Sequence, residues 1–370
     1  MIIKLSVLAL LLAFLLLPAC GGMKNSGAKD ASTVGLVVDM HCHVAGIGAG
    51  DSGCFVSEKL RKSWKYRIYL KAFGISEKEI MQHGDAVVIE RLSRNLARSK
   101  SVDAAVVLAM DGVIGDDGEL DRQLTEIYIP NEYMAKEVRK YDNLYFGASI
   151  NPYRPDALER LDRAASDGAV LVKWLPSIQH IDPADERLVP FYLRLKELGL
   201  PLLTHAGDEN SFTDARNELG DPARLHLPLK LGVTVIVAHA ATTGKNDGID
   251  NMERLLPMFA EYPNLYTDIS SLTQINKMGS LARLLESEVP QDRLLYGTDM
   301  PLLKTGIASP LFFALKLPLG RIIALAGTDN PWDQDFGLKR ELGVPAGVFT
   351  NAAGLLNLQG VQAGNISNRP

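Results

Sequence analysis

The chain has 370 residues, a formal net charge of -5 and 46% hydrophobic residues. This length suits one large barrel domain with additions, or two domains of ordinary size. The mildly acidic balance and the scattered lysines and arginines argue against nucleic acid or an anionic lipid surface as a partner.

Residues 1–19 have the pattern of a lipoprotein signal peptide. Lys4 precedes an apolar stretch from Leu5 to Leu17, which is short for a membrane-spanning helix. The following Leu-Pro-Ala-Cys-Gly-Gly looks like a bacterial lipobox, in which Cys20 carries the lipid, and residues 20–34 have the small polar composition of a flexible tether. We expect a protein held by a lipid anchor on the periplasmic side of a bacterial cell-envelope membrane. The alternative is an ordinary secretory signal.

Two further cysteines, Cys42 and Cys54, lie close together in the sequence. In an oxidising compartment a disulfide between them is one expectation, and two unlinked thiols are the other. No further cysteine is present to complete a cysteine metal site, so we do not expect them to bind metal.

From residue 35 onward, short apolar runs alternate with longer helical patterns. The runs suit strands buried on both faces of a parallel sheet, and they occupy residues 35–41, 103–110, 143–150, 169–175, 200–206, 233–240, 264–270 and 293–299. Helix-like segments between them include residues 155–166, 184–198, 251–261 and 278–288. Eight such units predict an α/β fold, a (β/α)₈ TIM barrel over residues 35–358, with a doubly wound open sheet as the alternative.

Two regions depart from this rhythm, the insertion at residues 44–101 and residues 300–370 after the eighth strand. Residues 44–101 form an insertion that opens with a glycine-rich loop and continues as helical segments. If its basic stretch folds over the barrel mouth, Arg61, Lys65 or Arg67 would favour an anionic substrate. After the eighth strand, residues 327–337 have an irregular polar pattern, a helix-like run follows near 348–357, and residues 359–370 form a C-terminal tail.

Two histidines close the first predicted strand. His41 and His43 are two residues apart, and such residues point to the same side of a strand. Both imidazoles are therefore expected to face the barrel mouth, where active sites of this fold lie, while Cys42 faces away. Asp39 would share the face of His41 and either support a histidine ligand or serve a structural role.

Four more polar residues end later strands. Lys173 ends the fourth predicted strand and His205 the fifth, while His239 ends the sixth. Asp299 ends the eighth. Because one strand–helix unit takes about 30 residues, these positions are successive or alternate strand ends, and they meet at the mouth if the sheet closes.

These residue types suit a divalent cation, with zinc as our first expectation and one or two ions in the site. Imidazole and carboxylate are zinc ligands that leave a position for water, which the metal activates as a nucleophile. Asp299 could ligate the metal, take the proton of the nucleophile and pass it to the leaving group. His239 could complete a second metal site or hydrogen-bond the oxygen of a polarised carbonyl.

Several motifs resemble the amidohydrolase superfamily, namely VDMHCH at 38–43, THAG at 204–207, AHA at 238–240 and YGTDMP at 296–301. Two others look like its amidohydrolase-related branch of TIM-barrel hydrolases and decarboxylases, namely VKWLP at 172–176 and FTNAAGLLNL at 349–358. The resemblance covers residues 35–358. It implies a catalytic or second-metal role for His239 and a catalytic metal on His41, His43, His205 and Asp299.

Lys173 has three alternative roles. In some members of the superfamily a carboxylated lysine on the fourth strand bridges two metals, and a lysine here would also suit a substrate carboxylate. The third alternative is a side chain that extends to solvent. His180, in the loop after this strand, is a candidate for substrate binding or an ordinary solvated histidine.

The sequence thus predicts a metal-dependent hydrolase that acts on the amide, ester or lactone carbonyl of a small molecule. The alternative is a metal-dependent decarboxylase on the same barrel, which a lysine or arginine clamp near the mouth would favour. A non-catalytic, lipid-anchored binding protein is a third possibility. No nucleic acid partner is expected, and membrane contact is expected through the lipid alone.

Overall fold

The computed structural model describes residues 35–358. The predicted signal segment, Cys20, the tether and the C-terminal tail lie outside the described residues. Within residues 35–358, no helix combines the length and apolar character needed to cross a membrane.

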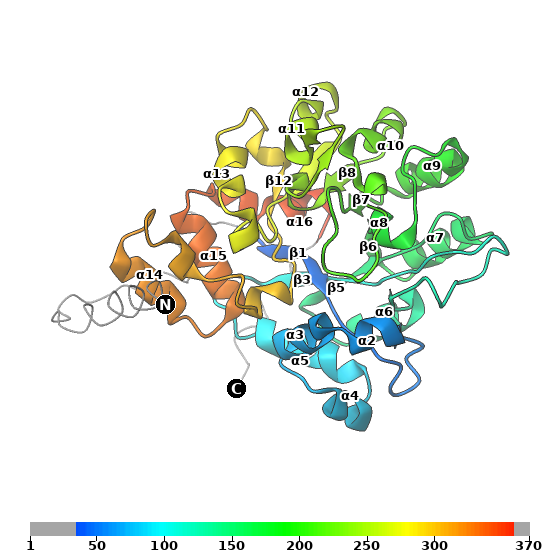
Figure 1. The fold of residues 1–370 in the computed structure, drawn as a ribbon, viewed down its shortest axis with the longest axis horizontal. Coiled ribbons are helices and arrows are strands. Elements are labelled where there is room, and N and C mark those ends of the chain that lie inside the picture. Colours follow the sequence, from blue (N-terminus) through cyan, green and yellow to red (C-terminus); the bar gives the residue numbers. More distant parts are fainter. Residues whose placement is uncertain (1–34, 359–370) are drawn as a thin grey trace, which may run out of the picture.

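Eight parallel strands form the central sheet, and each predicted apolar run overlaps one of them (Figure 1). In sheet order they are β1 (Val38–His43), β3 (Ala104–Leu108), β5 (Leu144–Ala148), β6 (Ala169–Trp174), β7 (Leu202–Thr204), β8 (Val235–Val237), β11 (Leu265–Asp268) and β12 (Leu294–Leu295). The backbone N–H of Met40 donates to the Tyr296 carbonyl, and that of His43 donates to Met300. These bonds join the last strand segment to the first, so the TIM barrel is confirmed and the open-sheet alternative is wrong.

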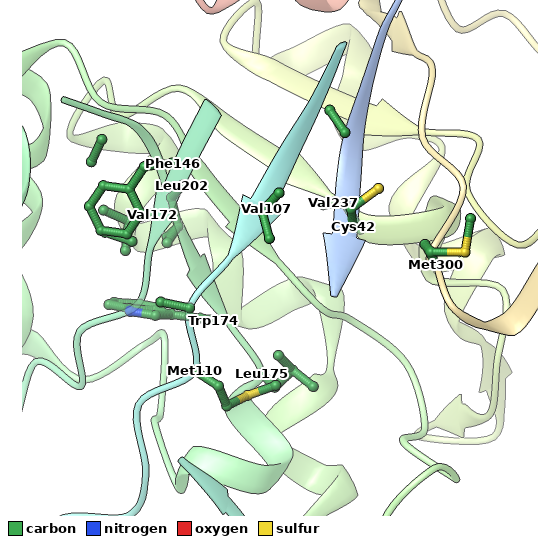
Figure 2. Close-up of a cluster of buried hydrophobic side chains, with 14 of the residues drawn as sticks. Cys42, Val107, Met110, Phe146, Val172, Trp174, Leu175, Leu202, Val237 and Met300 are labelled. Carbon is green, nitrogen blue, oxygen red and sulfur yellow. The ribbon is translucent and has the colours of Figure 1, made fainter. Parts of the chain in front are cut away.

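The strands are buried on both faces, which explains their continuous apolar character. One set of side chains fills the barrel interior, including Val38, Met40, Leu171, Leu203 and Ile236. A second set faces the surrounding helices, and Figure 2 shows part of it, including Cys42, Val107, Val172, Trp174 and Val237. Trp174 belongs to this outer set and stacks on Phe191 with ring centroids 5.5 Å apart.

An irregularity in β1 sets the direction of its functional side chains. Asp39 pairs with Ala105 but Cys42 pairs with Val107, so β1 holds one residue more than β3 over this interval. The extra residue interrupts the alternation of faces. The side chain of Met40 therefore packs inside the barrel, and the rings of His41 and His43 contact each other. Asp39 instead contacts Cys42, which belongs to the set of side chains that faces the helices. The prediction that Asp39 shares the face of His41 is wrong for this reason.

Helices surround the barrel (Figure 1). The predicted helical segments contain α7 (Ala157–Ser166), α9 (Val189–Leu198), α11 (Asn251–Leu255), α12 (Met258–Glu261) and α13 (Ser280–Leu285). The others beyond the insertion are α6 (Asn131–Val138), α8 (Pro176–Gln179), α10 (His226–Lys230), α14 (Leu319–Ala326), α15 (Pro331–Glu341) and α16 (Asn351–Leu355). A short hairpin joins β9 (Lys245–Asn246) and β10 (Ile249–Asp250).

The irregular structure predicted for residues 327–337 is wrong, because α15 begins there. The side chain of Asn330 accepts hydrogen bonds from the backbone of Trp332 and Asp333, and Pro331 occupies the first turn. An asparagine cap followed by proline is a strong start signal for a helix. Sequence reasoning missed this helix because residues 327–337 are polar and lack the apolar spacing of the other predicted helices.

The insertion consists of α2 (Glu58–Lys62), α3 (Trp64–Phe73), α4 (Glu77–His83), α5 (Ala86–Leu96) and β2 (Phe55–Val56), which pairs with β4 (Ile127–Tyr128). Side chains of helix α3 form hydrogen bonds with the backbone of the loop that follows β7. Lys65 Nζ donates to the Asn210 carbonyl at 2.7 Å, and the Tyr69 hydroxyl donates to Ser211 at 2.7 Å. Because Lys65 is bound in this way and Arg61 pairs with Glu77, both side chains have structural partners.

Cys42 and Cys54 are both buried free thiols, so the structure contains no disulfide between them. Burial, together with the carboxylate of Asp39, raises the pKa of Cys42 well above its usual value. Burial also raises the pKa of Cys54 to about 12. Both thiols are therefore protonated and poorly reactive near neutral pH.

Candidate metal centre

Three predicted metal ligands, which come from the first and last strands of the barrel, meet at its carboxyl end. His41 and His43 end β1, and Asp299 follows β12. Their potential ligand atoms all lie within 4.8 Å of one another. The two Nε2 atoms are 3.2 Å apart, and Asp299 Oδ1 lies 3.5 Å from His43 Nε2 and 3.7 Å from His41 Nε2.

Asp268, at the end of β11, orients the ring of His41. Its Oδ2 lies 2.8 Å from His41 Nδ1, and its Oδ1 accepts the hydroxyl of Ser270 and the backbone N–H of His239. Burial alone would raise the pKa of Asp268, but these partners hold it well below its usual value. A carboxylate on Nδ1 keeps the proton there and leaves the Nε2 lone pair of His41 free for a cation.

His205 and His239 lie beside each other at the ends of β7 and β8, with ring centroids 4.8 Å apart. Burial lowers the pKa of His205 to about 4, although the carboxylate of Glu209 opposes this shift. Burial also lowers the pKa of His239 and of His43 well below the usual value. All three imidazoles are therefore neutral near pH 7, which is the form that binds metal.

Within residues 35–358, two nitrogens of this second histidine pair have no hydrogen-bond partner, namely His205 Nε2 and His239 Nδ1. Both are buried, and buried polar atoms in folded proteins are almost always paired. Neutral imidazole nitrogens next to the His41, His43 and Asp299 group suit a divalent cation. The donor set thus fits a metal, whereas the ligand roles of His205 and His239 stay predictions.

Lys173 points into the barrel from β6, with Nζ 3.2 Å from His41 Nε2. Its side chain is 1% exposed, so the alternative in which it extends to solvent is wrong. Burial lowers the pKa of Lys173 to about 8, against the opposing effect of Asp268 and Asp299. Lys173 therefore keeps two alternatives: as the neutral amine it could be carboxylated and bridge metals, and as the cation it could bind a substrate carboxylate.

The backbone bends sharply where two of these residues leave their strands. His239 has a φ of 38° and Asp299 a φ of 61°, both in the left-handed region. The N–H of Asp299 donates to the carbonyl of His41 at 2.9 Å and ties the eighth strand end to the first. Such conformations persist only where the surrounding structure fixes them.

A buried network behind the centre fixes Thr298, the neighbour of Asp299. Asp39 accepts the backbone N–H and the hydroxyl of Thr298, at 2.9 and 2.5 Å. Its Oδ2 also accepts the indole N–H of Trp332, from α15, at 2.8 Å. Asp39 therefore has a structural role, and it connects α15 to the metal-ligand candidates through the backbone.

His180 follows the last residue of α8 and has a left-handed backbone, with a φ of 54°. Burial lowers the pKa of His180, and the charges that act on it come from Arg216, Asp214, Glu218 and Asp121. Its role in substrate binding stays a prediction.

Sequence reasoning missed Asp268, Glu209 and Lys277. Asp268 lies near the end of the seventh predicted strand, as the recognised ligands lie near the ends of theirs, so its position could have identified it. Glu209 and Lys277 lie in loops, where no periodic pattern shows which side chains turn toward the mouth. Glu209 Oε2 lies 3.7 Å from His205 Nδ1, and Lys277 donates to Ser271 Oγ at 2.5 Å.

Comparisons with known proteins agree with this fold. A family model described as amidohydrolase matches residues 38–329. An uncharacterised TIM-barrel protein from Bordetella bronchiseptica has a TM-score of 0.51 at 16% identity, over 84% of this chain and 99% of that one. The apo form of IDCase from Metarhizium anisopliae has a TM-score of 0.52 at 15% identity, over 89% and 99%. No curated protein sequence matches the chain.

Proposed function

The chain belongs to the amidohydrolase family, and on that premise we propose that it is a metal-dependent hydrolase acting on an amide, ester or lactone of a small molecule. The observation that carries this proposal is the convergence of His41, His43 and Asp299 within 4.8 Å. Zinc is the proposed ion, because imidazole and carboxylate ligands suit it.

In this proposal His41, His43 and Asp299 hold the ion, with His205 as a further ligand. A divalent cation bound there would acidify water and polarise the substrate carbonyl. Asp299 Oδ1 would take the proton of the attacking water and return it to the leaving group. His239, neutral and buried, would donate a hydrogen bond to the substrate oxygen or hold a second ion.

A decarboxylase is the second candidate, and a specific observation favours it. Two buried lysines, Lys173 and Lys277, act electrostatically on the histidines of the centre. Such cations suit a substrate that carries a carboxylate. The two candidates differ in product, since only decarboxylation releases carbon dioxide, and trapping of that gas during turnover decides between them.

Metal content tests both enzyme proposals. We expect the purified protein to contain one or two zinc equivalents, to lose turnover of its substrate in the presence of a chelator, and to regain it when zinc is restored. A protein without bound metal that turns over substrate equally well in chelator would contradict the proposed centre. The His41→Ala variant lacks one proposed ligand and should bind zinc more weakly. This comparison shows whether the zinc is bound at the centre or elsewhere on the protein.

We also propose that the protein resides in the bacterial cell envelope, anchored by a lipid on Cys20. Support comes from the apolar segment and the lipobox pattern before this residue. Expressed in a bacterial host with labelled palmitate, the wild-type chain should carry label and sediment with membranes, whereas Cys20→Ser should be unlabelled. Cys54→Ser is the matched control, because this thiol is buried inside the fold. An unlabelled wild-type chain would contradict the anchor.

A further inference from the structure

Lys277 is a buried cation beside the metal centre that the hydrolytic proposal does not use. It ends the 3₁₀-helix η5 (Ile275–Lys277), in the loop that follows β11, and is 7% exposed. Its Nζ donates to Ser271 Oγ at 2.5 Å. Among the residues that the structure describes, no carboxylate lies within 4.0 Å of this ammonium group.

The charge of Lys277 acts on histidines of the centre. After burial, it is the strongest influence on the pKa of His239, ahead of His205, His41 and Lys173. Burial lowers the pKa of Lys277 itself, and three carboxylates oppose the shift, those of Asp299, Glu209 and Asp268. The contacts place the Lys277 ammonium beside the cluster, because its partner Ser271 directly follows Ser270, whose Oγ lies 3.2 Å from His41 Nδ1.

Burying an ammonium with one neutral partner is costly, because three strong donors lose their water. A neighbouring side chain makes the deficit larger. Gln274 Nε2, three residues before Lys277, is buried without a partner among the described residues. A buried ammonium with one partner and a buried amide donor with none indicate that a ligand supplies the acceptors.

We propose that Lys277, assisted by Gln274, binds a carboxylate of the substrate next to the metal centre. The inference rests on the proposed function and narrows its substrate to organic acids. One ammonium and one neutral amide match the single charge of a carboxylate. A phosphate dianion would place two negative charges on one group close to Glu209 and Asp299, which repel it, whereas the two charges of a dicarboxylate lie on separate groups.

The test is the effect of Lys277→Met on the binding of two probes of similar shape, succinate and its uncharged diamide, succinamide. Binding is measured by calorimetry, with and without added zinc. We expect the variant to lose about tenfold or more of the succinate affinity, because a charge-assisted hydrogen bond disappears, and to keep the succinamide affinity. Replacing a buried charge with an apolar side chain of similar length usually preserves the fold, which thermal unfolding checks.

Lys230→Met is the matched control, because it removes the same charge from an exposed position at the end of α10, on the approach to β8. It should leave both affinities unchanged. An equal loss of both probes in Lys277→Met, or no loss of succinate affinity, overturns the inference. Tighter binding of inorganic phosphate than of succinate by the wild-type protein overturns the choice of a carboxylate.

Failure of this inference differs from failure of the proposed function. A wild-type protein that binds zinc but shows no dependence of succinate affinity on Lys277 keeps its metal centre and loses only the carboxylate subsite. A protein that binds no zinc loses the hydrolase proposal. In that case the titration without zinc still decides whether Lys277 binds the acid.

Discussion

Replacing Asp299 with asparagine is expected to lower turnover by about 100- to 10,000-fold, since this is the usual contribution of a positioned proton carrier. Asparagine retains the size of the side chain and an oxygen that can face the cation, but it cannot take a proton. It also tolerates the left-handed backbone, here with a φ of 61°. The variant should therefore fold normally and retain metal while turnover collapses.

The measurement is turnover of the ester, lactone or amide that the wild-type protein hydrolyses best in a chromogenic panel, together with zinc content. Asp292→Asn is the control, because Asp292 is exposed and precedes the same strand at its opposite end. Its turnover should match that of the wild type. Unchanged turnover in Asp299→Asn would overturn the assignment of the proton carrier, and loss of zinc would reassign the effect to metal binding.

Asp268→Asn is expected to weaken zinc binding about 10- to 100-fold, which is typical when the hydrogen-bonding partner of a metal-binding histidine is removed. The Asp268 carboxylate lies 2.8 Å from His41 Nδ1 and holds the tautomer whose Nε2 faces the cluster. An amide removes the negative charge and allows the ring to turn or to exchange its tautomer. The measurement is competition for zinc against a chromogenic chelator at fixed pH.

Asp333→Asn is the matched control for this effect, because Asp333 is another buried carboxylate with several hydrogen bonds. It accepts the backbone N–H of Lys100 and Ser101 and the hydroxyl of Ser99, away from the histidines. Both variants should lose stability by about 1–3 kcal/mol, as expected for disturbed buried hydrogen bonds. Only Asp268→Asn should lose zinc affinity, and an equal change in both would contradict the role given to Asp268.

The metal-ligand candidates depend on contacts between segments far apart in the sequence. Asp39 on β1 binds the backbone of Thr298 and the indole of Trp332 on α15. Lys339, also on α15, is fully buried and donates to the carbonyl of Gly297 at 2.8 Å. Helix α15 thus contacts Gly297 directly and reaches Thr298 through Asp39, and these are the two residues that precede Asp299. The C-terminal region is therefore part of the support of the centre.

The sequence by itself determined the barrel and the first group of candidate ligands. Apolar runs and helical patterns of regular spacing identified all eight strands, because strands buried on both faces must be apolar throughout. His41, His43 and Asp299 could be found because each lies at or just after the carboxyl end of a predicted strand. Strand ends of a closed parallel barrel necessarily share one rim, so position along the chain was enough to predict that they meet.

The tertiary structure alone decided which neighbours complete the site. The extra residue in β1 reversed the expected direction of Asp39, because a bulge depends on how two strands pair and leaves no mark in the alternation of one strand. Glu209 and Lys277 come from irregular loops, where the direction of a side chain is set by packing against other segments. Their place beside the histidines therefore emerged only when the barrel and its loops were assembled.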